Sequence, residues 1–403
     1  MVFTKAMAPV LGLMTVAALA LTACSPAGEV TEPDAERGTY SIYASLSLTG
    51  PLAGSSQAQL EGLEIAVDVI NENGGINGET VELTHVDDQL DPTKAVTLLQ
   101  EQLDVAKPDL VIHGVSSSVA LAMLPLLTRE EVLSTGTPYS DLVNVPATNP
   151  YAFGTNPVVA LDPQAMAKLF KEKGYKKVAY LGGNDALGQS ISAAFESVLT
   201  KGGYNLQMES YAPADLDMTA QLQRLQAGNP DVLIIQGYGS AAGYALKSRT
   251  KLGWDIVTYG DGGLGNGNNL ALISDEADWD NLFLRVFAIN TDKRASGDSA
   301  AYKRVVSELQ KRGSKFDQLT QLYAFMWDAL HVVKQAVEQA DAKDAKSVAA
   351  ALEDLGKVKG DSPFIAFPEV RYSSTNHFLN LTPDAYIVVR PGPVVNGTIK
   401  SVK

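Results

Sequence analysis

The sequence predicts an α/β protein built from two lobes of the same plan. Along its 403 residues, apolar strands repeatedly lead through a turn of small residues into a helix. Two of these units, Pro108–Leu127 (PDLVIHGVSSSVALAMLPLL) and Pro230–Leu246 (PDVLIIQGYGSAAGYAL), share a Pro-Asp start, an apolar strand and a glycine turn. Ligands collect at the carboxyl ends of strands in open α/β sheets, so two such lobes facing one another predict a cleft between them.

The first 39 residues are expected to lie outside the fold. Lys5 precedes an apolar run that ends in Leu-Thr-Ala-Cys at Cys24, and this resembles a bacterial lipoprotein signal with its lipobox. The resemblance implies that residues 1–23 are a signal peptide and that Cys24 becomes the lipidated first residue. Residues 24–39 are polar and contain proline, which is typical of a flexible tether. No apolar run is long enough for a permanent membrane span.

Composition excludes several classes of function. The net charge of −14 disfavours nucleic acid, because binding it requires clustered lysine and arginine. Cys24 is the only cysteine, so the exported part has no disulfide. The four histidines fall in no zinc-binding pattern, and we expect neither a metal nor a cofactor. The ordinary proportion of hydrophobic residues, 45%, is enough for two cores.

The first lobe reads as alternating strands and helices. A strand at Tyr40–Leu48 leads into a helix with an apolar face, and Val81–Val86 is the next strand. Asp91 is expected to cap the following helix, with a proline at its first position. After the strand Leu110–Ile112, three serines stand where a helix begins, and a helix N-terminus with serine hydroxyls attracts a carboxylate or a phosphate.

The second lobe is expected to begin near Asn156. Asp162 is predicted to cap a helix that ends before Gly174, and Val178–Leu181 is a strand that leads into a glycine-rich loop without the ending of a phosphate-binding loop. Gly260–Gly265 fits GxGxxG but is better explained as a ligand-facing loop. The remaining predicted elements are the crossing strand Phe283–Ile289, the helices Ala300–Lys311, Leu319–Ala340 and Lys343–Leu355, a third crossing at Phe364–Val370, and the strand Tyr386–Val389.

The ordered set SLTGPLAG, GLEIAVDVINENGGING, DDQLDP, GVSSS, PDVLIIQGYG and TYGDGGLGN resembles the type I periplasmic binding proteins, specifically the branched-chain amino-acid-binding family of ABC importers. The resemblance implies two Rossmann-like lobes joined by three crossovers. Residues 40–156 with 288–366 would form lobe 1, and residues 157–287 with 367–403 would form lobe 2. The partners implied are a small amino acid, an ABC permease and an ATPase, and the chain is expected to act as a monomer on the outer face of the bacterial cytoplasmic membrane.

The resemblance also implies the ligand-binding residues. Ser117 would hold the ligand carboxylate, with Val115 and Ser116 forming the wall beside it. Thr137, with Gly136 next to it, is the candidate for a second hydroxyl on the same lobe. The two second-lobe residues implied are Tyr238, which would reach the ligand, and Asp261, which would pair with its ammonium group.

The pocket for the ligand side chain departs from the family pattern. Ser55 and Leu187 stand where relatives place aromatic rings, while Tyr139, Tyr323 and Trp327 are candidates for a replacement wall. The ligand is therefore a branched-chain or related amino acid or, alternatively, a short amide, urea or an aromatic carboxylic acid.

Two other classes of protein are disfavoured by the sequence. The rival class is a lipoprotein hydrolase, suggested by Ser116 with His113 close by in the sequence. However, GVSSS is not the GxSxG of a nucleophile elbow, and the His113 side chain is expected to be buried or to cap the strand end. We therefore expect no enzyme. A sensory receptor lobe would use the same fold, but the chain carries neither a signalling domain nor a second span.

Overall fold

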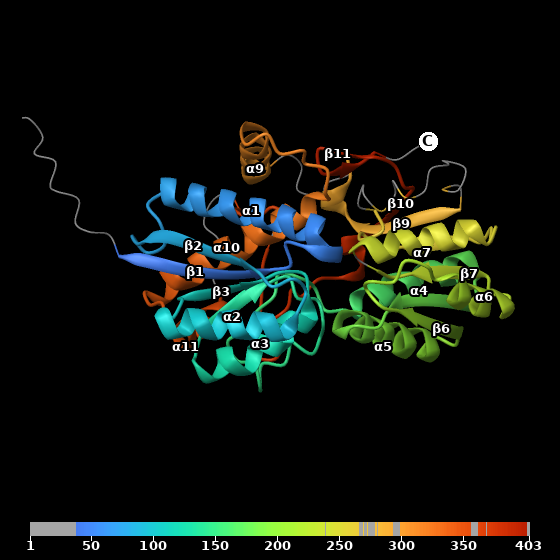
Figure 1. The fold of residues 1–403 in the computed structure, drawn as a ribbon, viewed down its shortest axis with the longest axis horizontal. Coiled ribbons are helices and arrows are strands. Elements are labelled where there is room, and N and C mark those ends of the chain that lie inside the picture. Colours follow the sequence, from blue (N-terminus) through green and yellow to red (C-terminus); the bar gives the residue numbers. More distant parts are fainter. Residues whose placement is uncertain are drawn as a thin grey trace, which may run out of the picture. The chain divides into compact units, whose positions relative to one another are not determined.

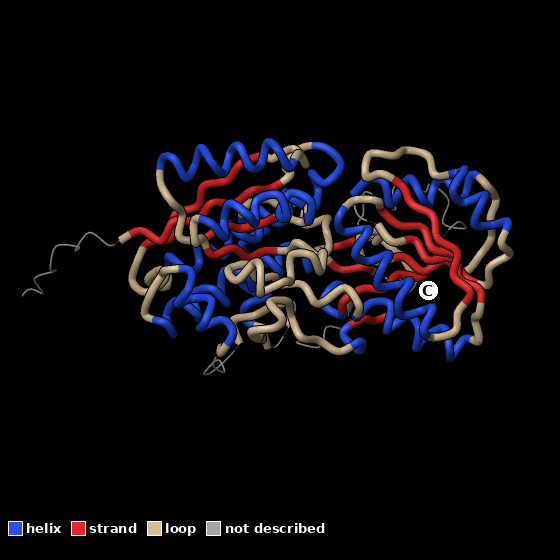
Figure 2. Tube along the Cα trace, turned by 90° about the horizontal axis from the view of Figure 1, so that it is seen from below, coloured by secondary structure: helices blue, strands red, loops and turns tan. Residues whose placement is uncertain are grey.

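The computed structural model describes residues 38–237, 239–265, 269, 272, 279, 281–292, 299–355, 362–367 and 369–400. The predicted signal peptide, the lipidation site Cys24 and the ligand candidate Tyr238 lie outside these residues. Figures 1 and 2 show the strands of the described part in two separate groups, each flanked by helices. This arrangement confirms the predicted α/β class.

The first sheet has the strand order β2-β1-β3-β4, and all its pairs are parallel. The strands β1, β2 and β3 are each followed by a helix that returns the chain to the same end of the sheet, as parallel pairing requires. The Asp91 carboxylate accepts hydrogen bonds from the N–H groups of Thr93 and Lys94, so the predicted cap is confirmed. The elements are β1 Thr39–Leu46, η1 Gly50–Leu52, α1 Ala53–Glu72, β2 Thr80–Asp87, α2 Pro92–Val105, β3 Leu110–His113, α3 Ser117–Arg129 and β4 Leu133–Gly136.

The second sheet has the order β10-β9-β8-β7-β5-β6, and its one antiparallel pair is the β9–β10 pair at one edge. Its elements are α4 Leu161–Lys173, β5 Lys177–Gly183, α5 Ala186–Lys201, β6 Asn205–Tyr211, α6 Thr219–Ala227, β7 Val232–Ile235, α7 Gly239–Lys251, β8 Thr258–Gly260, β9 Leu282–Phe287 and, after the chain has left and returned, η4 Pro383–Ala385 and β10 Tyr386–Val389. The strand β10 therefore joins a sheet whose other strands lie about a hundred or more residues earlier in the chain.

Each sheet is covered by apolar side chains on both faces, which explains why its strands read as continuous apolar runs. In the first sheet, Ile42 and Ala44 pack toward α1, α10 (Thr320–Ala340) and α11 (Ala345–Glu353), whereas Tyr43 packs toward α2 and α3. In the second sheet, α6 and α7 cover one face and α4 and α5 the other. The helix α9 (Ala300–Lys311) packs on the first lobe, to which it contributes Val305 and Leu309.

Crossing segments join the two sheets within the described residues. The first crossing follows β4. The segment around Phe153 lies beside β4, because Phe153 N donates to Ser134 O at 2.9 Å, and the chain then continues to α4. A second crossing follows β9 through η3 (Ala288–Asn290), and the stretch before η4 provides the third. The first and third crossings lie side by side, because Leu379 N donates to Asn156 O at 2.8 Å. The two-residue strands β11 (Val394–Val395) and β12 (Thr398–Ile399) follow β10 near the end of the chain.

One predicted helix cap is wrong. Asp162 was expected to cap α4, but the helix begins at Leu161 and its N-cap residue is Ala160. The Asp162 side chain instead turns inward and pairs with Arg285, because the buried guanidinium requires a compensating charge. The predicted end of the same helix is confirmed, since Gly174 is its C-cap with a φ of 77°. No helix in the described part of the chain combines the length and the hydropathy needed to cross a bilayer.

The contact between α1 and α10 depends on a glycine. A Cβ atom placed on Gly62 would lie 2.4 Å from the carbonyl oxygen of Tyr323, so only a hydrogen fits there. We expect Gly62→Ala to lower the free energy of unfolding by about 1 to 3 kcal/mol, because the helices must separate to accept the methyl group. The measurement is chemical denaturation of the exported part of the chain. Gln57→Ala, at an exposed position on the same helix, is the control, and equal stability of the two variants would contradict the packing argument.

Candidate functional site

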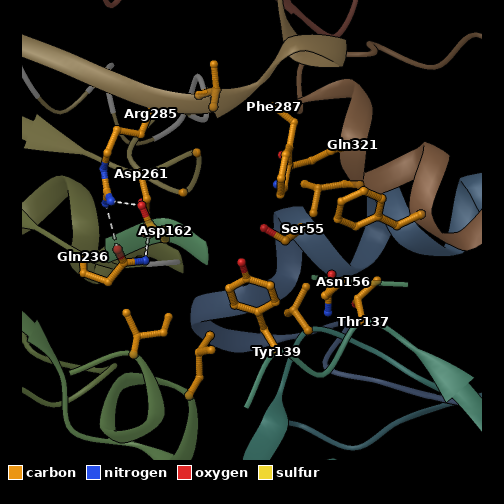
Figure 3. A pocket seen from close by; sticks show the side chains of 18 of the residues that line it. Ser55, Thr137, Tyr139, Asn156, Asp162, Gln236, Asp261, Arg285, Phe287 and Gln321 are labelled. Carbon is orange, nitrogen blue, oxygen red and sulfur yellow. Dashed lines mark hydrogen bonds and ion pairs between the residues drawn. The ribbon is translucent and has the colours of Figure 1, made fainter. Parts of the chain in front are cut away.

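A cavity of about 140 Å³ lies between the two lobes. Its volume approaches the roughly 150 Å³ of an engineered apolar cavity that binds benzene, so the cavity has room for a molecule of about that size. Figure 3 shows polar side chains gathered at opposite sides, with Ser55, Tyr139 and Phe287 between them. The first lobe and its helix α10 contribute Ser55, Gln59, Val115, Thr137, Tyr139, Asn156, Gln321, Leu322 and Phe325; the second contributes Asp162, Leu187, Ile191, Gln236, Gly237, Asp261, Gly262, Gly263, Arg285, Val286, Phe287 and Tyr386.

The second-lobe side is organised by Arg285, which points inward from the middle of β9 and is 1% exposed. Its guanidinium donates to the Asp162 carboxylate, to the Gln236 side-chain oxygen at 2.9 Å and to the carbonyl oxygen of Gly260 at 3.4 Å. The amide nitrogen of Gln236 donates in turn to Asp261. Four side chains, one from the middle of β9, one each from the ends of β7 and β8, and one from the start of α4, therefore form one connected network beside the cavity.

Asp261 is the acidic end of this network. Its carboxylate accepts hydrogen bonds from Gly237 N at 3.1 Å and Leu264 N at 3.2 Å, in addition to the bond from Gln236. Burial nevertheless raises its pKa to about 7, and the positive charge of Arg285 opposes that rise. Asp261 also lines the cavity, so its carboxylate can contact a cationic group of a ligand. The positive charge of such a group would favour the ionised form of the carboxylate.

The first-lobe side of the cavity carries no charged side chain among its described lining residues. Gln59 Nε2, on α1, donates to the hydroxyl oxygen of Thr137 at 2.6 Å, and both side chains are buried. Asn156 lies in the crossing segment next to them and is 4% exposed. These three residues offer hydroxyl and amide groups, which form hydrogen bonds with a ligand without supplying a charge.

The predicted serines do not line the cavity. Ser117 Oγ accepts hydrogen bonds from the N–H groups of Tyr139 at 3.0 Å and Ser140 at 3.1 Å, which anchors the turn that follows β4. Ser116 Oγ caps α3 by accepting a 3.4 Å bond from Val119 N. Gly136 has a φ of +136°, and a Cβ there would lie 2.1 Å from His113 O, so it permits the close approach of β3 and β4. The structure thus brings Val115, Thr137 and Asp261 together at the cavity, while Ser116, Ser117 and Gly136 shape the turns around it.

The cavity has an apolar and aromatic wall. Phe287, at the end of β9, stacks on Tyr386 with ring centroids 4.6 Å apart, and Phe325 of α10 meets Phe287 edge-on at 5.8 Å. Ser55 and Leu187 line the cavity as expected. Of the three aromatic candidates, Tyr139 lines it, whereas Tyr323 and Trp327 are buried in the core of the first lobe.

Direct hydrogen bonds also join the lobes around the cavity. The hydroxyl groups of Tyr139 and Tyr386 lie 2.6 Å apart, and those of Ser140 and Ser190 lie 2.5 Å apart. On the same side, Ala186 N donates to Ser118 Oγ at 3.4 Å. These bonds connect α3 and the turn after β4 of the first lobe with α5, its N-terminus and β10 of the second lobe.

The hydrolase constellation is not assembled. His113 is buried at the end of β3, both of its ring nitrogens lack a hydrogen-bond partner in the described part of the protein, and burial lowers its pKa to about 4. Its nearest serine in the sequence, Ser116, accepts its bond from the backbone of α3. Within the described ranges, no three histidine, cysteine or acidic side chains gather as a metal site.

Several cavity residues escaped the sequence analysis. Gln59 is buried on α1, whose inward face the sequence predicts from apolar residues alone, and Asn156 stands at the predicted start of the second lobe. Arg285 carried a usable signal, because a charged residue inside the apolar run LFLRVF must find a partner when the strand is buried. Gln236 and Tyr386 gave no such signal, since polar and aromatic residues are common at strand ends.

Comparison with known proteins places this geometry in a family. The sequence pattern of the family described as periplasmic binding protein matches residues 41–389. A Leu/Ile/Val-binding protein homolog from Brucella melitensis biotype 1 is 28% identical over 76% of this chain and 81% of its own length. The Leu/Ile/Val-binding protein BraC3 from Rhizobium johnstonii is 29% identical over 76% of this chain and 81% of its own length.

Solved structures share the fold. A leucine-binding protein, LivK from Thermotoga maritima, superimposes with a TM-score of 0.75 at 20% identity, covering 90% of this chain and 97% of its own. A solute-binding protein of an ABC transporter from R. palustris, solved in complex with benzoate, gives a TM-score of 0.71 at 19% identity, covering 91% and 96%. The two-lobed fold with its cavity and the match over most of the sequence agree, and the chain therefore belongs to the periplasmic binding protein family of exported solute-binding proteins, with the type I fold.

Proposed function

We propose that this protein is the lipid-anchored solute-binding component of an ABC importer and that it binds a small α-amino acid with an aliphatic side chain. The observation that carries the ligand class is the division of the cavity. Asp261, on the second lobe, provides a carboxylate for an ammonium group, while the first lobe offers uncharged donors for a carboxylate. The Leu/Ile/Val-binding names of the relatives support the same class.

The apolar lining supports an aliphatic side chain. Val115, Leu187, Ile191, Leu322 and Phe325 border the cavity, and none of them offers a hydrogen bond to a polar side chain. Tyr238 follows the cavity residue Gly237, and we propose it as a ligand contact because the family resemblance implies that role.

Transport follows from lobe closure. A ligand that contacts both lobes binds the closed state more tightly than the open state, so it shifts the population toward closure. We propose that the closed form is the one recognised by an ABC permease with its ATPase, and that the protein carries and releases its ligand without chemical change. The anchor would be a lipid on Cys24, and the polar stretch 24–39 would serve as the tether.

The function is tested by the thermal unfolding of residues 40–403 with a ligand panel. A ligand present at about a hundred times its dissociation constant adds roughly 2.7 kcal/mol of stability, enough to raise the unfolding midpoint by several degrees. We expect this rise with leucine, isoleucine or valine. A rise only with short amides, urea or benzoate would preserve the binding role but refute the amino-acid assignment.

Asp261 is tested by removing its charge. Asp261→Asn should weaken binding of the amino acid roughly ten- to hundredfold, because a charge-assisted hydrogen bond contributes about 1.5 to 3 kcal/mol. The deaminated acid of the same size should bind both proteins alike. In the unchanged protein, affinity for the amino acid should rise between pH 6 and 8 as Asp261 loses its proton, and the substitution should remove this rise. Calorimetry across that pH range measures both effects, and equal losses for the two ligands would refute the ammonium contact.

The anchor is tested separately in cells. We expect the full-length protein to appear in the membrane fraction and to incorporate a labelled fatty acid, and Cys24→Ala to abolish both because no other cysteine can carry the lipid. Ser25→Ala is the matched control and should leave both unchanged. Retention of the label in the Cys24→Ala protein would show that the lipid is attached elsewhere.

A further inference from the structure

Gln321 adds a polar group to the apolar wall of the cavity. It is the second residue of α10, it faces the cavity in Figure 3, and Leu322 and Phe325 of the same helix line the cavity with it. Its side chain is only partly buried, and its Nε2 atom has no hydrogen-bond partner among the described residues. The neighbouring Gly262 has no side chain to cover this atom, and a Cβ there would lie 3.6 Å from it. The Gln321 amide is therefore accessible from the cavity.

Asn290 fixes which end of the Gln321 amide faces the cavity. Its Oδ1 atom accepts a 3.0 Å bond from the backbone N–H of Gln321, a group that can only donate. The other polar atom of Asn290 is therefore its NH₂ nitrogen, and the Gln321 atom that lies 2.6 Å from it must be the oxygen Oε1. Asn290 is fully buried in η3, so this pairing is held in place and the Gln321 NH₂ group is left for the cavity.

Ser55 provides a hydroxyl beside the same wall. It belongs to the first turn of α1 and lines the cavity, and its Oγ atom makes no hydrogen bond with the residues that the structure describes. Figure 3 shows Ser55 and Gln321 close to Phe287, between the acidic side of the cavity and Thr137. A purely apolar ligand side chain placed against this wall would leave an amide donor and a hydroxyl without partners, which costs affinity.

We propose that Gln321 and Ser55 form a specificity subsite for a hydroxyl group on the ligand side chain, with Asn290 as the positioning residue. The Gln321 NH₂ group donates to the ligand oxygen, and the Ser55 oxygen accepts the proton of the ligand hydroxyl. The ligand class is then an aliphatic amino acid that carries a hydroxyl, such as threonine, which has the shape of valine. The inference rests on the proposed function and refines it, because it concerns the ligand side chain and leaves the ammonium contact of Asp261 unchanged.

The test compares the affinities of threonine and valine by calorimetry. Gln321→Leu removes the donor and keeps a side chain of similar size, so the ratio of threonine to valine affinity should fall roughly three- to tenfold, as expected for one neutral hydrogen bond. Valine should bind at least as well as before. If this variant does not fold, Gln321→Met removes the donor with an unbranched side chain and should give the same fall. An unchanged ratio, or an equal loss for both ligands, would overturn the proposal.

Gln339→Leu is the matched control. Gln339 lies on the same helix, is exposed and does not line the cavity, and its amide donates to the carbonyl oxygen of Asp354 at 2.9 Å. The same chemical change at this position should leave the threonine-to-valine ratio unchanged. A similar fall in the control would show that the stability of α10 sets the ratio, and would overturn the proposal. Ser55→Ala should lower the ratio as well, and an unchanged ratio would exclude Ser55 from the subsite.

The positioning role of Asn290 has its own readout. Asn290→Asp leaves only oxygens that accept, so the Gln321 amide must turn its NH₂ group toward them and its own oxygen toward the cavity. O-methylserine, whose ether oxygen can only accept, should then lose affinity roughly tenfold relative to norvaline, which has the same shape. Threonine, whose hydroxyl can also donate, should keep its affinity relative to valine. Equal changes of the two ratios, or no change in either, would show that Asn290 does not orient the amide.

Failure of this inference is distinguishable from failure of the proposed function. If the unchanged protein binds valine or leucine and the Gln321 variants keep the threonine-to-valine ratio, only the inference fails. If the unchanged protein binds short amides, urea or benzoate and no amino acid, the proposed function fails, and the inference fails with it because no amino-acid side chain reaches the subsite.

Discussion

The structure of the site depends on the charge of Arg285 being buried in the second sheet. A guanidinium that is 1% exposed is stable only with partners, and its partners are Asp162 on α4, Gln236 after β7 and the carbonyl oxygen of Gly260 at the end of β8. These bonds fix the carboxyl ends of neighbouring strands and the start of a helix in one arrangement. Removing one partner of such a buried pair costs about 3 to 5 kcal/mol, so the network is a structural requirement before it is a binding surface.

The same network sets the electrostatics of the cavity. The Asp162 carboxylate compensates the charge of Arg285. The Gln236 amide links Arg285 to Asp261, because its oxygen accepts a hydrogen bond from Arg285 and its nitrogen donates one to Asp261. The second lobe therefore presents one carboxylate with a pKa near neutrality and no uncompensated cation among the described lining residues. The first lobe complements it with neutral donors. This division suits a small dipolar ligand, and it explains why the cavity needs no free arginine or lysine to hold a carboxylate.

The crossing segments do more than connect the lobes. Phe287 at the end of β9 and Tyr386 at the start of β10 provide aromatic wall, and Asn156 provides a polar group. Ser55 and Leu187, the positions where relatives are expected to carry rings, provide little aromatic surface. The hydroxyl pair of Tyr139 and Tyr386 adds a direct link between the lobes at the same place.

The sequence by itself determined the α/β class and most of the elements, because strand and helix periods, caps such as Asp91 and the C-cap Gly174 are local properties of the chain. The resemblance to the family implied that Val115, Thr137 and Asp261 bind the ligand, and the structure places all three at the cavity. Only the tertiary structure decided which side chains form hydrogen bonds and ion pairs with one another. Asp162 left its expected cap for Arg285, 123 residues away, and Ser117 accepts bonds from a turn 22 residues away. The cavity roles of Gln59, Asn156 and Tyr386 arise from contacts between distant segments, which no local pattern records.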